Sequence, residues 1–196
     1  MYSFIQLIRH KLPIIWNVIE YVNATAFQFR YGRKVDSLSN LILKFNNDRI
    51  TYHLAEIVDA PKLVDFFRRQ PEEAFQYFKP HGFDIDTIKK IIKNPSFIVI
   101  LAKSESSVVG YAFLRCFSNG KSFRGKIVDI DYRGQGIAKQ FGIITTEVAQ
   151  KIGVGLYGTI SKGNVSSMKS SESSNEIKVI EELSDDFLLI QYLPKR

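Results

Sequence analysis

The sequence contains a single cysteine, Cys116, among its 196 residues. One thiol cannot form an internal disulfide and cannot supply a cysteine-based zinc site. Small domains stabilised by disulfides or by cysteine-bound zinc are therefore excluded. The chain must therefore rely on a hydrophobic core, and its hydrophobic content of 45% is normal for a chain that buries one. Cys116 stands close to Tyr111, Phe113 and Leu114, which predicts a buried thiol rather than a nucleophile. A lone thiol fits a reducing compartment, and we expect a cytoplasmic protein.

Long apolar runs are also missing. The most apolar N-terminal stretch, residues 12–29, is interrupted by Asn17, Glu20 and Asn23, so it does not predict a transmembrane helix. No uninterrupted apolar block precedes a small-residue cleavage site, so the sequence predicts no signal peptide. With a single cysteine in the chain, we expect no metal site.

Positive charge is in excess and unevenly distributed. The net charge is +7, and residues 1–50 carry seven Lys or Arg against three Asp or Glu. Such a balance suits nucleic acid, anionic lipid or a phosphorylated ligand. The N-terminal aromatic residues follow helical spacing rather than forming a stacking platform, and no nucleic-acid-binding motif is recognisable. We therefore expect no nucleic-acid partner.

Residues 1–47 differ in texture from the rest and predict an N-terminal helical extension. Their apolar residues recur at spacings of three, four and seven, which marks one face of a helix: Ile5, Ile8, Leu12, Ile15, Ile19, Val22 and Phe29. Two interpretations stay open. The helix packs on the following domain, which we favour, or residues 1–35 lie with their basic flanks on an anionic membrane surface at the inner membrane face.

Residues 48–196 predict a single domain of α/β or α+β class, because strands and helices are interleaved. Alternating or continuous apolar patterns predict seven strands, at residues 49–54, 97–102, 108–117, 127–130, 156–160, 177–180 and 187–193. Helical periodicity predicts helices over residues 84–92, 137–152 and 164–173, and another that opens at Asp59 with that residue as its cap.

The most informative segment is Arg133–Ala138, which follows a predicted strand and opens the helix over residues 137–152. A helix N-terminus presents unpaired N–H groups and partial positive charge, so phosphates bind there. Gly134 and Gly136 allow close approach of the backbone. Lys139 occupies the position where a dinucleotide fingerprint needs its third glycine, and no Gly-Lys-Ser/Thr follows for a Walker loop.

The pattern Arg/Gln-x-x-Gly-x-Gly/Ala, met here by Arg133, Gly136 and Ala138, resembles the acetyl-CoA loop of the GCN5-related N-acetyltransferases, the GNAT superfamily. Residues 161–168, with Asn164 and an Asn-x-x-Ser/Ala spacing, are similar to that family's next helix. The resemblance spans residues 48–194. It implies a mixed, mostly antiparallel twisted sheet of six to seven strands flanked by helices, here preceded by the N-terminal helical extension.

The resemblance also implies an activity and a binding site. Family members bind acetyl-CoA and transfer its acetyl group directly to an amine, so acetyl-CoA is the expected ligand. Backbone groups of the fourth strand would hold the pantetheine, the glycine loop the pyrophosphate, and Asn164 the pantetheine or a water. Carried onto this sequence, the cofactor-binding residues would be Val128, Asp129, Ile130, Arg133, Gly134, Gln135, Gly136, Ile137, Ala138, Lys139, Asn164 and Ser167.

The catalytic acid and base of many family members have no counterpart here. The fourth-strand glutamate is absent from Phe123–Lys126, and Ser171 stands where a tyrosine often acts as general acid. His81 is the best alternative base, because histidine titrates near neutrality. The opposing interpretation is a loop histidine bonded to Asp84 or to backbone. Asp129 is a further candidate, either facing the acceptor or facing solvent.

The expected acceptor is a primary amine of a small molecule. The stretch around His81 is similar to one in some bacterial relatives, which suggests an amino sugar or a nucleotide-linked amino sugar. The alternative function is a non-catalytic CoA-binding or scaffold protein, because the usual acid and base are missing. The sequence does not choose between a monomer and a dimer.

Overall fold

A computed structural model describes residues 13–195 and contains a seven-stranded sheet with the order β1-β2-β3-β4-β5-β7-β6. Every neighbouring pair is antiparallel except β4 and β5, which are parallel. The strands are β1 (Thr51–Leu54), β2 (Phe97–Ser104), β3 (Ser107–Cys116), β4 (Lys121–Val128), β5 (Gly155–Ser161), β6 (Asn175–Glu182) and β7 (Phe187–Pro194). The predicted mixed, mostly antiparallel sheet flanked by helices is confirmed.

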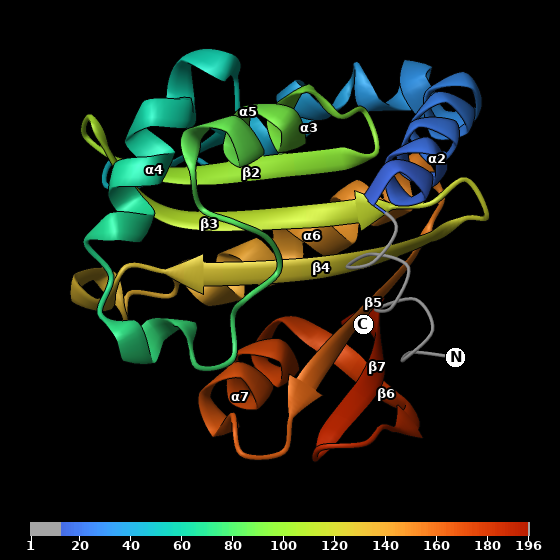
Figure 1. The fold of residues 1–196 in the computed structure, drawn as a ribbon. Coiled ribbons are helices and arrows are strands. Elements are labelled where there is room, and N and C mark those ends of the chain that lie inside the picture. Colours follow the sequence, from blue (N-terminus) through green and yellow to red (C-terminus); the bar gives the residue numbers. More distant parts are fainter. Residues whose placement is uncertain (1–12, 196) are drawn as a thin grey trace.

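Helices cover both faces of the sheet (Figure 1). They are α2 (Pro13–Val35), α3 (Leu38–Leu43), α4 (Ala60–Arg68), α5 (Ile85–Lys93), α6 (Ile137–Ile152) and α7 (Val165–Ser174). Short 3-10 turns are η1 (Ile57–Asp59), η2 (Glu72–Phe75) and η3 (Ile130–Tyr132). Helices α4 and α5 lie on one face, while α3 and α6 lie on the other.

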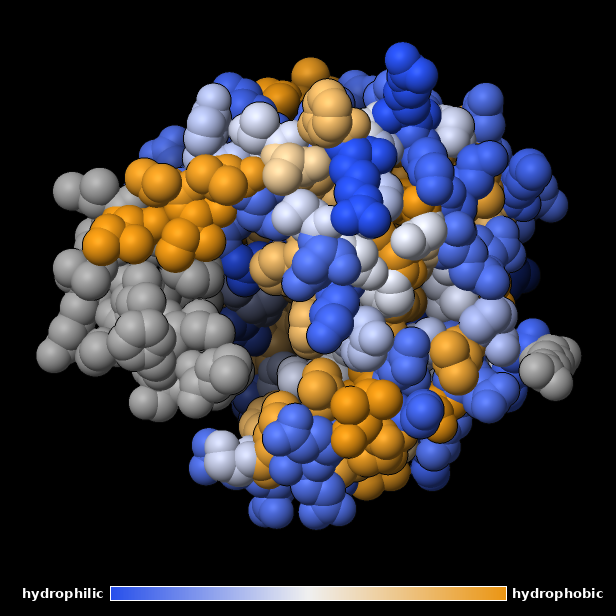
Figure 2. Space-filling view, turned by 90° about the vertical axis from the view of Figure 1, so that its right-hand side faces the viewer, coloured by the Kyte–Doolittle hydropathy of each residue, from blue (hydrophilic) through white to orange (hydrophobic). Residues whose placement is uncertain are grey.

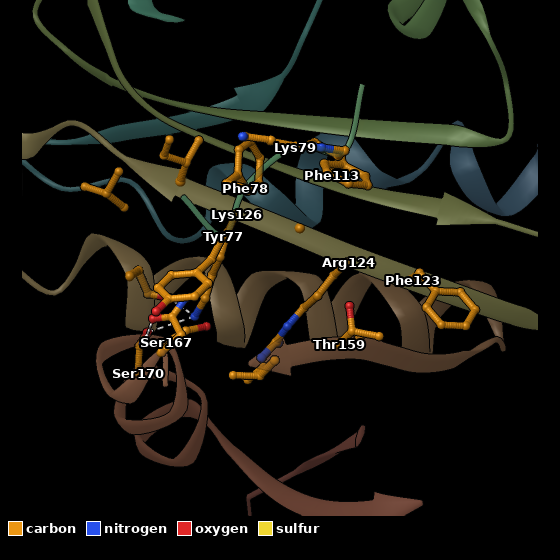
Figure 3. Close-up of a pocket in the computed structure, with 18 of the residues that line it drawn as sticks. Tyr77, Phe78, Lys79, Phe113, Phe123, Arg124, Lys126, Thr159, Ser167 and Ser170 are labelled. Carbon is orange, nitrogen blue, oxygen red and sulfur yellow. Dashed lines mark hydrogen bonds between the residues drawn. The ribbon is translucent and has the colours of Figure 1, made fainter. Parts of the chain in front are cut away.

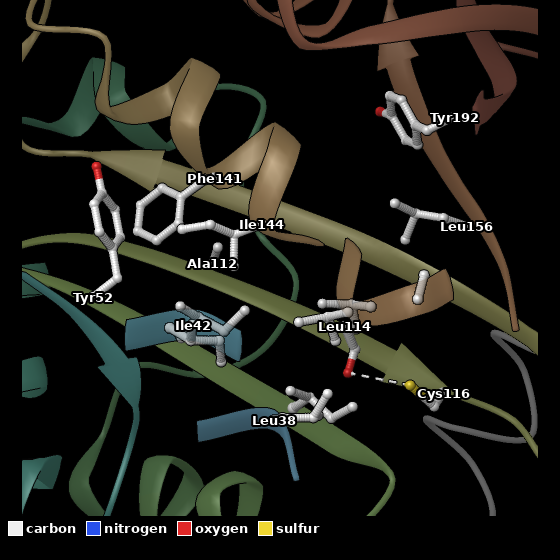
Figure 4. Close-up of a cluster of buried hydrophobic side chains, with 14 of the residues drawn as sticks. Leu38, Ile42, Tyr52, Ala112, Leu114, Cys116, Phe141, Ile144, Leu156 and Tyr192 are labelled. Carbon is white, nitrogen blue, oxygen red and sulfur yellow. Dashed lines mark hydrogen bonds between the residues drawn. The ribbon is translucent and has the colours of Figure 1, made fainter. Parts of the chain in front are cut away.

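The sheet is buried on both faces, which explains why its central strands are almost continuously apolar. In β2, Ile98 and Ile100 pack with α3 and α6, and the intervening Val99 and Leu101 pack with α4 and α5. This alternation follows from the two-residue period of a strand. Figure 4 shows the α3–α6 side of the core, where Cys116 is fully buried. Burial raises the pKa of its thiol to about 12, so the prediction of an inert buried thiol is confirmed.

Helix α2 packs on the domain through a face that the apolar spacing did not mark. Phe27 and Tyr31 are buried in the core, and Asn23 donates to the Cys116 carbonyl (3.0 Å) and accepts from the Ser118 N–H (3.0 Å). Glu20 forms an ion pair with Arg115 of β3.

The prediction that the apolar face of α2 packs on the domain is therefore wrong. Ile5, Ile8 and Leu12 lie outside the described residues. The remaining members, together with Val18 and Tyr21, are exposed, and Phe29 is 93% exposed. Figure 2, which views the molecule from the side where α2 lies, shows apolar side chains gathered at the surface. We name the exposed residues Ile15, Val18, Ile19, Tyr21, Val22 and Phe29 the α2 strip. No helix of the described residues is long and apolar enough to cross a membrane.

Two local predictions were also wrong. The fourth strand was expected at residues 127–130 but runs from Lys121 to Val128. Asp59 occupies the N-cap position of α4 but makes no capping hydrogen bond. Its carboxylate instead accepts from the Glu56 N–H (2.9 Å) and pairs with Lys103 (2.7 Å) and His53 (3.3 Å), so it ties the α4 start to β1 and β2.

Candidate functional site

The loop between η3 and α6 has the geometry of an anion site. Gly134 and Gly136 adopt φ values of +78° and +82°, a left-handed region that glycine enters without strain. Gly136 is the N-cap of α6, and the first intrahelical bond runs from the Gln140 N–H to its carbonyl. The N–H groups that precede Gln140 in the first turn have no intrahelical acceptor. A Cβ on either glycine would meet nothing within 4 Å, so both face open space.

Strands β4 and β5 are paired only at their starts. Their register ends at Phe123 opposite Tyr157, although both strands continue to Val128 and Ser161. Beyond that point a cavity of about 1260 Å³ separates them, lined by residues 123–128 of β4 and 158–161 of β5. The cavity also reaches the glycine loop and α7 (Figure 3). The anion site and the gap between the strands therefore form one continuous site.

The antiparallel pairing of β3 and β4 determines which backbone groups face this gap. The Asp129 N–H donates to the Val109 carbonyl (2.9 Å), and bonding to β3 alternates along an antiparallel ladder. The N–H and C=O groups of Arg124, Lys126 and Val128 therefore point toward β5. Because β5 diverges from β4 beyond Phe123, these backbone groups are available to an extended ligand that carries amide groups.

Most of the predicted cofactor residues line the cavity. These are Val128, Arg133, Gly134, Gly136, Ile137, Ala138, Lys139, Asn164 and Ser167. Three predicted residues do not line it, namely Asp129, Ile130 and Gln135. Asp129 and Ile130 lie beyond the end of β4, and the Ile130 N–H donates to the Gln70 side chain (3.2 Å). The strand residues at the gap are thus displaced toward Arg124 from those predicted.

Neither interpretation of Asp129 describes its placement. Its carboxylate is buried and accepts from Arg69 Nε (2.7 Å), Gln70 Nε2 (3.0 Å) and the Asp131 N–H (3.1 Å). Burial raises the pKa of Asp129, but these hydrogen bonds outweigh burial and leave the pKa below its ordinary value. Asp129 is therefore shielded from solvent and lies outside the cavity lining, and it anchors the end of β4 to the end of α4.

Ser171 does not line the cavity either. It is 1% exposed, and its hydroxyl accepts a hydrogen bond from Arg124 Nη2 (3.4 Å). The side chain thus faces the interior between β4 and α7. This placement supports a packing role rather than proton transfer to a thiolate.

His81 lines the cavity, but both of its ring nitrogens are engaged. Nδ1 lies 2.7 Å from the Gly82 carbonyl oxygen and must donate to it, because a carbonyl only accepts. In the neutral ring Nε2 then accepts from the Tyr111 hydroxyl at 2.8 Å. Burial raises the pKa of Tyr111 above its ordinary value, so that hydroxyl keeps its proton. The backbone-bonded interpretation of His81 matches this geometry.

Asn164 caps α7 and also borders the cavity. Its Oδ1 accepts from the Ser167 N–H (3.1 Å) and from the Ser166 hydroxyl (3.2 Å). Within residues 13–195, its amide nitrogen has no hydrogen-bond partner of its own. The side chain can therefore cap its helix and still offer two donors to a ligand.

The sequence interpretation missed Arg124 and Lys126, which both line the cavity from β4. It noted only that this stretch lacks a carboxylate. The signal in the sequence is the spacing, because two basic residues two apart in a strand share one face. Figure 3 shows both side chains reaching from β4 toward α7, where Lys126 Nζ donates to Ser170 (2.8 Å).

The cavity wall is strongly cationic. Its basic residues are Lys79, Lys90, Arg115, Arg124, Lys126, Arg133 and Lys139. Its acidic residues, within the described part of the chain, are Glu20 and Glu73, and Glu20 is paired with Arg115. Such a wall favours a ligand that carries several negative charges.

The sheet opens beside a glycine-rich helix N-terminus, so the space between β4 and β5 has the shape of a site for an extended, phosphorylated ligand. The fold is that of the GCN5-related N-acetyltransferases, as the sequence predicted. No family model and no curated protein sequence matches the chain, so the likeness comes from solved structures.

Three of these structures illustrate the likeness. The GNAT domain of S. lividans PAT has a TM-score of 0.64 at 12% identity, over 72% of this chain and 88% of that one. The PaiA N-acetyltransferase of Thermoplasma acidophilum, in complex with coenzyme A, has a TM-score of 0.60 at 14% identity, over 74% and 98%. The ribosomal-protein-alanine N-acetyltransferase of Brucella melitensis has a TM-score of 0.58 at 20% identity, over 72% and 98%. At these identities the likeness establishes the fold.

Proposed function

We propose that this protein is an acyl-CoA-dependent N-acyltransferase that transfers an acetyl or related acyl group to a primary amine of a small molecule. One observation carries the proposal: the gap between β4 and β5 opens directly onto the left-handed glycines at the start of α6. An extended thioester with a pyrophosphate at one end matches that shape. The neighbours that contain coenzyme A or an acetyltransferase domain have the same fold.

In this proposal, different groups of the chain bind different parts of the acyl-CoA. The N–H groups from Gly134 to Lys139 bind the pyrophosphate, and Arg133 and Lys139 add positive charge. The backbone of Lys126 and Val128 holds the amides of the pantetheine arm. A β4 N–H that faces the gap donates to the thioester carbonyl oxygen as it gains negative charge.

The amine nitrogen then attacks the thioester carbon, a C–N bond forms, and the C–S bond breaks with its electron pair leaving on sulfur. The proton lost by the nitrogen ends on the thiolate, carried by water. Since His81 Nε2 accepts from Tyr111, we assign it no proton from the amine. Activity is therefore expected to rise with pH as more of the amine becomes neutral.

For the acceptor we propose an amino sugar or a nucleotide-linked amino sugar. The cavity wall contains several aromatic rings, including Tyr77, Phe78 and Phe113, and it also contains Lys79. Aromatic faces suit a sugar ring, and the cation suits a linked phosphate.

Calorimetric titration with acetyl-CoA tests the cofactor site. We expect binding by the wild type and a loss of at least tenfold in affinity for Gly134→Glu, which puts a negative charge and a strained backbone where the pyrophosphate binds. Gly120→Glu is the matched control, because Gly120 also has a left-handed φ (+83°) but lies in the β3–β4 turn away from the cavity. Equal affinities for the two variants would contradict the site.

The alternative is a CoA-binding protein without catalysis. Release of free CoA thiol is measured with acetyl-CoA and a panel of amines that includes amino sugars, polyamines and peptide N-termini. Turnover with any member supports the enzyme. Tight acetyl-CoA binding with silence across the panel favours the non-catalytic alternative.

We also propose that the α2 strip contacts an anionic membrane surface. Tyr21 and Ala24 of α2 line a shallow hollow with Lys89, Lys90 and Lys93 of α5. Exposed Arg30 and Arg33 follow along the same helix. Apolar residues beside cations are the surface that an anionic lipid headgroup region attracts.

Vesicle flotation tests this contact. The wild type is expected to float with vesicles that contain anionic lipid and less with neutral vesicles. Val22→Asp should reduce flotation several-fold. Val179→Asp is the matched control, because Val22 and Val179 are similarly exposed (59% and 52%) and Val179 lies on β6. Equal flotation of both variants would end the proposal.

A further inference from the structure

Two cations stand side by side in the wall of the cavity. Arg124 and Lys126 are two residues apart on β4, so their side chains share one face of the strand. Arg124 is 8% exposed, yet it borders the cavity, as does Lys126. Both side chains point from β4 toward α6 and α7.

Neither cation is paired with a carboxylate among the described residues. Arg124 donates from Nη1 to the Gly142 carbonyl (3.3 Å), Thr145 Oγ1 (3.2 Å) and Asn175 Oδ1 (2.9 Å), and from Nη2 to Ser171. None of these acceptors is a carboxylate, and the centroid of the Tyr192 ring lies 3.3 Å from the guanidinium carbon.

The hydrogen-bond partners of Lys126 are also not carboxylates. Its Nζ donates to the Ala138 carbonyl (2.8 Å) and to Ser170 Oγ (2.8 Å). Burial lowers its pKa well below the ordinary value, and the charge of Arg124 lowers it further. Burial also lowers the pKa of Arg124. Buried positive charge without a counter-ion is costly. An anion that arrives with a ligand would therefore stabilise this part of the cavity wall.

The two cations face different parts of the gap. Lys126 bonds to Ala138 in the first turn of α6, beside the glycine loop. Arg124 lies about 7 Å farther along β4, next to Phe123, where β4 and β5 meet. A CoA thioester whose pyrophosphate occupies the loop directs its acyl end toward that closed end of the gap. Lys126 is therefore near the phosphates and Arg124 near the acyl group.

We propose that the acyl group transferred by this protein ends in a carboxylate, which Arg124 binds. The donor is then the CoA thioester of a short dicarboxylic acid, of succinyl length. The inference rests on the proposed function and changes only the identity of the acyl group. An acetyl group is neutral and would leave Arg124 without a counter-ion.

The transfer balances as it does for acetyl. The amine nitrogen bonds to the thioester carbon, the C–S bond breaks, and CoA leaves as the thiol with the proton that the nitrogen lost. The distal carboxylate takes no part in bond making and stays paired with Arg124. The product is an amide that carries one free carboxylate.

Calorimetric affinities for succinyl-CoA and butyryl-CoA test the proposal, because these esters have equally long acyl chains that differ by a carboxylate in place of a methyl group. The wild type is expected to bind succinyl-CoA at least tenfold more tightly. Arg124→Gln should abolish that preference. Lys139→Gln, an exposed cation beside the loop, should weaken both esters equally and preserve it.

Four results would overturn the proposal. If the wild type binds succinyl-CoA no more tightly than butyryl-CoA, the inference fails and the CoA site stands, and this comparison needs no variant. If Arg124→Gln folds, as judged by cooperative unfolding, and keeps the preference, Arg124 is structural. If Arg124→Gln weakens free CoA as much as succinyl-CoA, Arg124 serves the phosphates. If no ester binds, the proposed function fails together with the inference.

Discussion

At the scale of single residues, Asp129 shows how a carboxylate beside a candidate site can be structural. Its folded pKa lies below the ordinary value because hydrogen bonds from Arg69, Asp131 and Gln70 outweigh burial. A depressed pKa means that the ionised form stabilises the fold at pH values above about 4, the ordinary aspartate pKa. This contribution is lost as the pH falls through the lower, folded pKa.

We predict that Asp129→Asn lowers the free energy of unfolding at pH 7 by about 2 kcal/mol, the typical worth of hydrogen bonds to a charged group. Urea unfolding of both proteins between pH 7 and pH 3 measures it. The difference should shrink as the pH falls below about 4. The exposed Asp131→Asn should change stability by less than about 0.5 kcal/mol. A difference between wild type and Asp129→Asn that does not vary with pH would contradict the assignment.

Residue types in the loop were readable from the sequence, whereas residue partners were not. Gly134 and Gly136 are predictable because a left-handed turn before a helix selects glycine locally. The role of Asp129 depends on Arg69 and Gln70, about sixty positions away, and that of His81 on Tyr111, thirty positions away. Only the folded sheet brings such pairs together, so side-chain chemistry alone could not identify these partners.

At the scale of elements, local patterns predicted α6 well and β4 poorly. The apolar period of α6 and its terminating Gly153, with φ of +89°, gave the observed bounds of Ile137–Ile152. In β4, Arg124, Gly125 and Lys126 interrupt the apolar pattern, so the strand was placed too late. All three residues line the cavity.

The packing face of helix α2 was predicted wrongly for a different reason. Spacing identifies an apolar face but does not say whether that face is the one that packs. The contact with the domain uses Glu20, Asn23, Phe27 and Tyr31, a mixed face whose polar members bond to specific partners.

Close packing of α6 against α7 gives a prediction about a helical glycine. A Cβ on Gly142 would overlap the Ser174 side chain, which is buried. We expect Gly142→Ala to destabilise the protein by about 1–3 kcal/mol through overpacking, although alanine favours helix.

Gly32→Ala in α2 is the matched control for this substitution. There the added Cβ meets only the flexible end of the exposed Gln28 side chain, so the change should be neutral or stabilise by up to about 1 kcal/mol. Thermal unfolding of both variants measures the difference. If Gly142→Ala is as stable as Gly32→Ala, α7 shifts to accommodate the added methyl group at little cost, which contradicts the prediction.

At the scale of the whole molecule, the N-terminal helices share the core with the rest of the chain. Phe27, Leu38 and Ile42 are fully buried in the cluster that also contains Ile144 and Leu114 (Figure 4). The division into residues 1–47 and 48–196 remains a prediction from sequence texture. The shared core indicates that the second part does not complete its packing alone.

We therefore predict that a chain of residues 48–196 lacks cooperative unfolding. Each large side chain lost from the core costs about 2–5 kcal/mol, and several are lost together from a stability of about 5–15 kcal/mol. Near-ultraviolet circular dichroism and urea titration measure this, with Leu38→Ala in the full chain as an intermediate. A truncated chain with the same urea midpoint as the full chain would establish residues 48–196 as an independent domain.

The separation of β4 from β5 has a consequence for the mechanics of the molecule. On one side of the gap lie β1–β4, and on the other β5–β7, joined by only three register pairs and by the helices behind them. A ligand that bonds to both strand edges would act as a bridging strand and couple the two halves. Ligand occupancy would then add to the cohesion of the fold, and the midpoint of thermal unfolding would rise with ligand concentration. The opening between β4 and β5 would then be the line along which the protein without ligand is least stiff.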